Sequence, residues 1–178
     1  MEVRDAMMQR RSVRQFTDSL VPEAALQDLM ECAMAGPSAH NLRPWEFYMV
    51  KNKALQDKLR LVTRYSTMNS PLILIVAGNL DRTIPGEGND FWVQDCSAAV
   101  ENILLAATSL GLGSCWVGLH PFGQAVKKVR DILGLQENIV PLALIHLGYG
   151  GKTPPARTQY DAQRVHIYEE NDSEEAGK

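Results

Sequence analysis

The spacing of apolar positions along the chain predicts helices that alternate with strands. Residues 22–35 show the helical pattern, because apolar side chains recur at i, i+3, i+4 and i+7 and Gly36 follows as a terminator. Residues 72–77 are continuously apolar, which is typical of a fully buried strand. By the same criteria, we predict helices over residues 2–10, 22–35, 53–63, 90–110 and 124–133. Strands are predicted over residues 45–50, 72–77, 114–117 and 139–147, with a strand-like alternation at 165–167 that has no partner adjacent in sequence.

The longest predicted helix, residues 90–110, is rich in small residues. Alanines at 98, 99, 106 and 107 permit a neighbouring helix to approach closely, which indicates a central helix or one that faces a second subunit. The side chains expected to pack inward are Ala99, Val100, Ile103, Leu104 and Ala107. Alternating helices and strands would also fit a doubly wound nucleotide-binding fold, but the sequence lacks the glycine-rich turn that such a fold places after its first strand.

Length and charge narrow the class of protein. The chain has 178 residues, and we expect residues 1–168 to form a single domain. The formal net charge is −3, and residues 169–178 alone carry −4, so these are expected to form a flexible acidic tail. Nucleic-acid-binding proteins usually carry a basic excess, which disfavours that class. Since no apolar stretch approaches the ~20 residues of a membrane span and no signal peptide is evident, we expect a soluble cytoplasmic protein.

Residues 10–14, Arg-Arg-Ser-Val-Arg, place three guanidinium groups and a hydroxyl within five positions. Arginine offers planar, charged donors in pairs, which suits a phosphate group. A solvated basic turn between a helix and a loop would have the same composition. Spacing alone leaves both interpretations open.

Three other segments are candidates for ligand contact. Small and polar residues at 37–41 can place backbone and amide donors against a flat polar ligand, although a turn after a helix favours the same residues. The segment 111–118, with three glycines, can bring backbone close to a ligand, although a helix end followed by a buried strand also explains it. Arg157 follows two prolines, and a surface arginine is its simplest interpretation.

Several kinds of catalytic site are not encoded. The four histidines are scattered without metal-binding spacing, and neither a GxSxG elbow nor a Walker loop occurs. The cysteines Cys32, Cys96 and Cys115 form no CxxC pair and are expected to be reduced and buried. Anion-binding segments without a nucleophile or a metal site are typical of an enzyme whose cofactor performs the chemistry.

Four segments, in this order, resemble the nitroreductase family of FMN-dependent oxidoreductases. They are RRSVRQF at 10–16, PSAHNLRPWEF at 37–47, LGLGSCWVG at 110–118 and GYGGKTPPAR at 148–157. The resemblance covers roughly residues 4–168. It implies an α+β, three-layer fold with a central mixed or antiparallel sheet flanked by helices. It also implies an intertwined homodimer in which the C-terminal strand, here the 165–167 alternation, crosses onto the partner's sheet.

The resemblance further implies two FMN molecules at the subunit interface. Residues of the first motif and of the tail would contact the phosphate and one edge of the flavin ring. Arg11 and Val13 would act mainly through their backbone, and Arg14 would reach the pyrimidine side of the ring. The implied contacts are Arg10, Arg11, Ser12, Val13, Arg14 and Arg157 from these segments; Pro37, Ser38, Ala39 and Asn41 from the other subunit; and Trp116, Val117 and Gly118 along the ring.

The activity that the resemblance implies is hydride transfer from NADH or NADPH to flavin N5, followed by reduction of a small acceptor, such as a nitroaromatic or a quinone, in a ping-pong cycle. A guanidinium at Arg14 would stabilise the negative charge that reduction leaves on the ring. Two alternatives stay open. One is the same fold used for reductive dehalogenation or flavin fragmentation, and the other is a non-catalytic flavin-binding redox sensor.

Two features depart from the larger members of the family. Those members often carry a lysine over the ring at the position of Pro155, for which Lys152 is the nearest substitute. The loop over residues 79–89 is also short, in the region where larger members insert helices that cover the substrate. An open site over the flavin is therefore expected.

Overall fold

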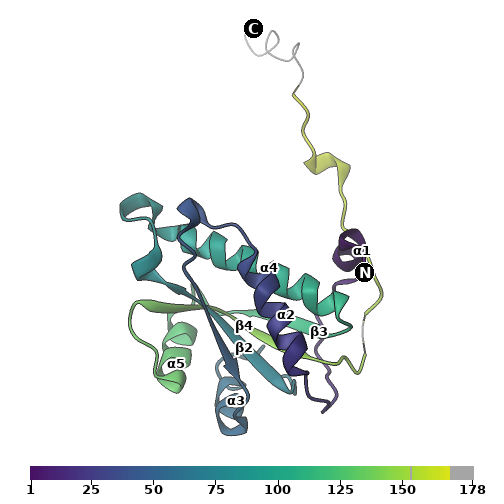
Figure 1. The fold of residues 1–178 in the computed structure, drawn as a ribbon, viewed down its shortest axis with the longest axis horizontal. Coiled ribbons are helices and arrows are strands. Elements are labelled where there is room, and N and C mark those ends of the chain that lie inside the picture. The colour runs from purple at the N-terminus through teal and green to yellow at the C-terminus, as the bar shows by residue number, and fades with distance from the viewer. Residues whose placement is uncertain (153, 169–178) are drawn as a thin grey trace.

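A four-stranded antiparallel sheet forms the centre of the computed structural model, which describes residues 1–152 and 154–168 (Figure 1). The strands β1 (Trp45–Val50), β2 (Leu72–Asn79), β3 (Gly113–Gly118) and β4 (Ile139–Gly148) lie in the order β1-β2-β4-β3. The two most apolar strands, β2 and β4, therefore occupy the middle of the sheet. Their central position explains the continuous apolar run at 72–77, and all four predicted strands are confirmed.

Helices cover both faces of the sheet and give three layers. Helices α2 (Glu23–Met34) and α4 (Phe91–Ser109) pack on one face, and α3 (Lys53–Leu59) and α5 (Gly123–Leu133) pack on the other (Figure 1). Alternate residues of β2 serve the two faces. Leu74 and Val76 belong to the cluster under α2 and α4, whereas Ile73 and Ile75 belong to the cluster under α3 and α5. The expected α+β, three-layer fold is confirmed, with an antiparallel sheet.

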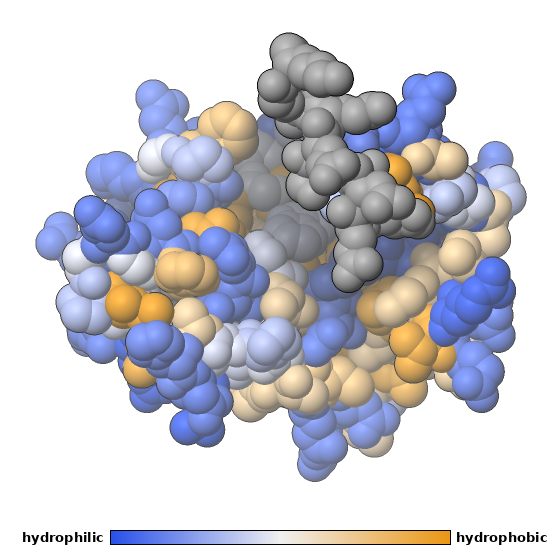
Figure 2. Space-filling view, turned by 90° about the horizontal axis from the view of Figure 1, so that it is seen from above, coloured by the Kyte–Doolittle hydropathy of each residue, from blue (hydrophilic) through white to orange (hydrophobic). Residues whose placement is uncertain are grey.

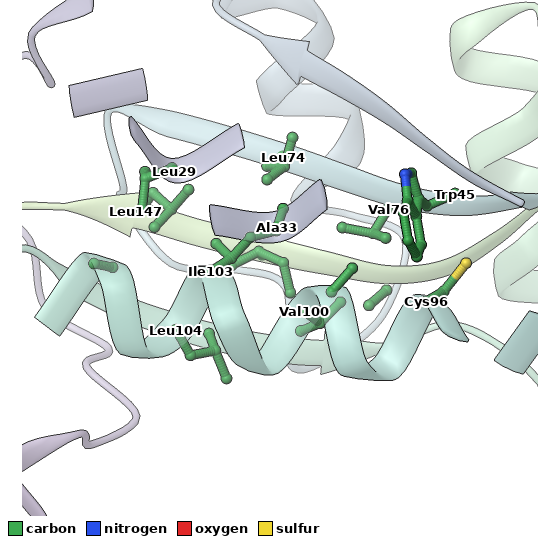
Figure 3. Close-up of a cluster of buried hydrophobic side chains, with 14 of the residues drawn as sticks. Leu29, Ala33, Trp45, Leu74, Val76, Cys96, Val100, Ile103, Leu104 and Leu147 are labelled. Carbon is green, nitrogen blue, oxygen red and sulfur yellow. The ribbon is translucent and has the colours of Figure 1, made fainter. Parts of the chain in front are cut away.

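The predicted inward face of α4 is confirmed in the larger core. Val100, Ile103 and Leu104 pack among side chains of α2 and of the central strands, including Ala33 and Leu147 (Figure 3). All five side chains expected to face inward are at most 3% exposed. Burial of one large aliphatic side chain contributes about 1.5–3 kcal/mol, so this helix is a main source of stability.

Helix α3 ends at Leu59, four residues before its predicted limit, because side chains bond the backbone that follows. Arg60 Nε donates to the carbonyl of Met68 at 2.8 Å, and Arg60 Nη2 donates to the carbonyl of Ser70 at 2.8 Å. Gln56 Nε2 donates to the carbonyl of Pro71 at 2.9 Å. These bonds fold residues 60–70 back toward the start of β2 instead of letting the helix continue.

The termini lie outside the three layers. The short helix α1 (Val3–Gln9) buries only Ala6, whereas Val3 and Met7 are exposed. Residues 154–168 run away from the body and contain one 3₁₀ turn, Ala162–Arg164 (Figure 1). Val165 and Ile167 are exposed and form no strand within the described part of the chain. The predicted acidic tail, residues 169–178, lies outside the described residues.

Two further findings concern the cysteines and the helices. Cys96 and Cys115 are buried as expected, but Cys32 is exposed, because it lies on the outward side of α2. Among the residues that the structure describes, the helices are too short or too polar to cross a membrane.

Candidate functional site

Residues 10–16 run beside the start of β3. The Val13 N–H donates to the carbonyl of Ser114 at 2.9 Å, and Ser12 forms an isolated bridge with the same residue. Val13 is only 3% exposed. A Cβ at Gly113 would lie 2.9 Å from the Val13 Cβ, so this close approach requires glycine in β3. The segment is thereby fixed to the sheet, and its arginines are positioned by a strand.

Asn69 holds the other end of the same segment. The Phe16 N–H donates to Asn69 Oδ1 at 3.2 Å, and Asn69 Nδ2 donates to the Phe16 carbonyl at 2.9 Å. Asn69 was not among the residues predicted from the sequence, because its partner lies 53 positions away in the chain. The nearest sequence indication is its place two residues before Pro71, the proline that precedes β2.

Four of the predicted cationic residues and one hydroxyl gather around a cavity of about 340 Å³. They are Arg10, Arg11, Ser12, Arg14 and Arg157. Arg11 Nη1 donates to the carbonyl of Pro155 at 2.6 Å, which ties the tail to the first motif. Loss of solvation and the positive charges of Arg157 and Arg10 lower the pKa of Arg11. An anion in this cavity would relieve that repulsion.

A larger cleft of about 680 Å³ adjoins this cavity, since Arg14 lines both. Trp116, Val117 and Gly118 line it as predicted. Several lining residues were missed, because they converge only through the fold of residues 60–70 and the start of α5. They are Arg64, Tyr65, Thr67, Met68, Asn69 and Phe122. Cys115 was also missed, although it directly precedes Trp116 in the third motif. This volume lies within the range of small-molecule sites, ~300–1,000 Å³, and can admit a flat ring system.

The cleft lining offers no strong acid or base. Its residues include no aspartate, glutamate or histidine. Burial raises the pKa of the Cys115 thiol, and the opposing effects of Arg14 and Ser12 are smaller. The thiol therefore stays protonated at neutral pH and is a poor nucleophile.

The predicted segment 37–41 lies at the end of α4 that is opposite to α1 (Figure 1). The Ala39 N–H donates to Oδ1 of the buried Asp95 in the first turns of α4, at 2.9 Å. His40, Asn41 and Arg43 have φ values of 50°, 56° and 50°, a left-handed conformation that costs non-glycine residues energy. The predicted contacts Pro37, Ser38, Ala39 and Asn41 therefore line neither the cavity nor the cleft of their own chain.

The two departures noted in the sequence also have structural counterparts. The Pro155 carbonyl accepts the bond from Arg11, and Lys152 lines neither the cavity nor the cleft. Residues 79–90 form two short 3₁₀ turns, Leu80–Arg82 and Gly86–Asp90, and contribute nothing to the cleft lining.

The chain was compared with known proteins. A model of the nitroreductase family matches residues 7–66 and 58–149. A protein of Methanothermobacter thermautotrophicus named "Putative NADH dehydrogenase/NAD(P)H nitroreductase" is 40% identical over 94% of this chain and 87% of its own length.

Solved structures agree with this match. A "Putative NADH Oxidase" from Clostridium acetobutylicum has a TM-score of 0.86 at 33% identity, covering 93% of this chain and 99% of that chain. An "FMN-dependent Nitroreductase" from Clostridium difficile R20291 has a TM-score of 0.83 at 27% identity, covering 92% of this chain and 98% of that chain. On the family model and the 40% identity over nearly its whole length, this chain belongs to the nitroreductase family.

Proposed function

We propose that this protein is an FMN-dependent oxidoreductase that carries electrons from NADH or NADPH to a small acceptor, such as a nitroaromatic or a quinone. One observation carries the proposal: a cationic cavity and a ring-sized cleft adjoin each other and share Arg14. This pairing matches the phosphate and the ring of FMN. The names of the relatives, which include NAD(P)H and FMN, support the same assignment. When bound, FMN would supply the redox chemistry by accepting a hydride from the nicotinamide and passing two electrons on.

The residues of the cavity fit a phosphate. Arg10, Ser12 and Arg157 would donate charge-assisted hydrogen bonds to its oxygens. Arg11 and Val13 would contribute mainly backbone, because the Arg11 guanidinium already bonds Pro155 and the Val13 side chain is buried.

The residues of the cleft fit the ring. Arg14 is exposed between the two spaces, and its guanidinium would stabilise negative charge at the pyrimidine edge. Trp116, Val117 and Gly118 would lie along the ring. Since the cleft lining holds no titratable carboxylate or imidazole, we propose that protons reach the acceptor from solvent.

We also propose that the active form is a homodimer in which Pro37, Ser38, Ala39 and Asn41 serve the site of the partner subunit. An uncovered groove of about 340 Å³ lies between α1, α2 and α4, with Val3, Cys32 and Ala106 in its lining. On the face from which the C-terminal segment leaves, apolar side chains gather among polar ones (Figure 2). A second subunit could cover this groove and pair with the extended Val165–Ile167 segment. Light scattering on the full chain should give twice the monomer mass, and a monomer at micromolar concentration would contradict the proposal.

An anaerobic stopped-flow experiment tests the electron transfer. FMN-loaded protein is mixed with NADH or with NADPH, and flavin absorbance is followed. We expect fast bleaching with at least one donor and parallel initial-rate plots when an acceptor is added. Protein that does not retain FMN, or bound FMN that neither nucleotide reduces, would overturn the proposal, and sequential kinetics would contradict the ping-pong order.

A further inference from the structure

We propose that Arg64 selects acceptors that carry an anionic group, and that the preferred acceptor is an aromatic compound bearing a carboxylate. This inference rests on the proposed function and specifies the substrate class of the same cleft. Arg64 lies on the 60–70 segment, outside the four segments that carry the family resemblance, and it lines the cleft beside Trp116 and Phe122.

The Arg64 side chain is held in place by its neighbour. Its Cζ lies 4.6 Å from the centroid of the Tyr65 ring, and its Nη2 donates to the Tyr65 hydroxyl. Stacking on the ring fixes the plane of the guanidinium, which lowers the entropy lost when a ligand binds.

Charge balance leaves the Arg64 guanidinium available for a ligand. Within residues 1–152 and 154–168, no aspartate or glutamate lies at ion-pair distance from it. The hydrogen bond to the Tyr65 hydroxyl uses one of the five N–H donors of Arg64. Arg14 is the second cation of the cleft, and among the described residues of the chain no acidic side chain lines the cleft to offset them. An anionic acceptor would therefore be favoured over a neutral one of the same shape.

Exposed aromatic side chains indicate that the acceptor is aromatic. Tyr65 is 60% exposed and Phe122 is 68% exposed, although both line the cleft. Large aromatic faces in a site stabilise flat ligands by stacking and by burial of apolar area. A ligand with a flat ring and one carboxylate uses both features of this lining.

The charge that Arg64 meets would belong to the acceptor itself. Arg64 lines the same cleft as Trp116, Val117 and Gly118, which are proposed to lie along the flavin ring, so a small acceptor that reacts at the ring stays beside this lining. The 2′-phosphate of NADPH is separated from the nicotinamide by two riboses and a pyrophosphate, so it would lie beyond the cleft. Arg64 should therefore affect the acceptor half of the cycle and not the choice between NADH and NADPH.

The test compares 4-nitrobenzoate with 4-nitrobenzamide, which differ in charge but little in shape. Reduction of either to the nitroso compound consumes two electrons and two protons and releases water, while the carboxylate or amide is unchanged. Holoenzyme and the Arg64→Gln variant are assayed for kcat/KM with each acceptor. Arg64→Lys keeps the charge, and Arg82→Gln removes an exposed arginine that lies outside the cleft.

We expect Arg64→Gln to lower kcat/KM for 4-nitrobenzoate about tenfold and to change that for 4-nitrobenzamide less than about twofold, the loss of one hydrogen bond to a charged group. Arg64→Lys should restore part of the preference, and Arg82→Gln should leave it intact. Equal losses with both acceptors, or a loss confined to reduction by NADPH, would overturn the inference. Wild-type protein that reduces neither acceptor would instead contradict the proposed function.

Discussion

Residues 10–16 and residues 37–43 both contain predicted cofactor contacts, but the fold holds the two segments differently. The first segment is joined to β3 through Val13 and to Asn69 through Phe16, and its polar side chains face cavities of their own chain. The second is anchored by Asp95 at the far end of α4, in a strained conformation, and lines neither cavity. One segment thus lines spaces of its own chain, whereas the other would serve a site only in the proposed second subunit.

The largest effect should follow from removing the cations of the first segment's cavity. The double variant Arg10→Ala with Arg157→Ala should raise the Kd for FMN roughly a hundredfold or more, because each charged hydrogen bond contributes about 1.5–3 kcal/mol. Fluorescence titration with FMN measures this. Arg4→Ala, which removes an exposed arginine of α1 outside the cavity, is the control. An unchanged Kd in the double variant would place the phosphate elsewhere.

The next largest effect concerns the buried side chain of His146, which lies near Phe16 of the first segment. His146 is fully buried, its Nδ1 lies 2.7 Å from Ser70 Oγ, and its ring centroid lies 6.4 Å from that of Phe16. Burial, with a smaller contribution from the Arg60 charge, lowers the pKa of His146 to about 4, against the small opposing effect of a backbone bond to Ser66. The folded state therefore favours neutral His146.

The pKa of His146 in the folded state lies below the unfolded value near 6.5. The contribution of neutral His146 to the free energy of unfolding is therefore fully present above pH 6.5 and is lost as the pH drops toward 4. The loss attributable to this residue should reach about 3 kcal/mol, at about 1.4 kcal/mol per pH unit. Urea unfolding measured between pH 7 and pH 4 tests this. In the His146→Gln variant this component should disappear, and an identical pH slope in both proteins would contradict the assignment.

A smaller effect should follow from separating the first segment from the sheet. In Gly113→Ala, the new Cβ would lie 2.9 Å from Val13 Cβ, so the segment or the strand must shift. We expect a loss of about 1–3 kcal/mol in the free energy of unfolding, together with weaker FMN binding. Gly123→Ala, where a Cβ meets nothing within 4 Å, should cause neither change. If Gly113→Ala kept full stability and affinity, the close approach would not position the arginines.

The same contrast shows what the sequence could and could not predict. The periodicity of α4 and the apolar run of β2 are local patterns, so these elements could be predicted from them. The arrangement in three layers was implied by the family resemblance. The early end of α3 depends on Arg60 reaching the carbonyls of Met68 and Ser70, which no periodicity encodes.

The candidate site also combines residues that local sequence indicates with residues that only the fold brings together. Its arginines were recognised because they are adjacent in sequence and match a family motif. Asn69 and Arg64 were missed because they reach the cleft only after residues 60–70 fold back. The function of 37–41 in a second subunit stays a prediction, since it depends on contacts that one chain does not contain.

The smallest effect should come from the strain in the second segment. His40 is exposed, has a φ of 50° and forms no hydrogen bond through its ring within the described residues. His40→Gly should raise the free energy of unfolding by about 0.5–1 kcal/mol relative to His40→Ala, because only glycine adopts this conformation without a Cβ penalty. Both variants are unfolded in urea at one fixed protein concentration, since a dimer's stability depends on it. His40→Ala removes the same imidazole but keeps the Cβ, so the difference between the two isolates the backbone strain from the loss of the side chain. Equal stabilities would mean that the left-handed conformation at His40 carries no strain.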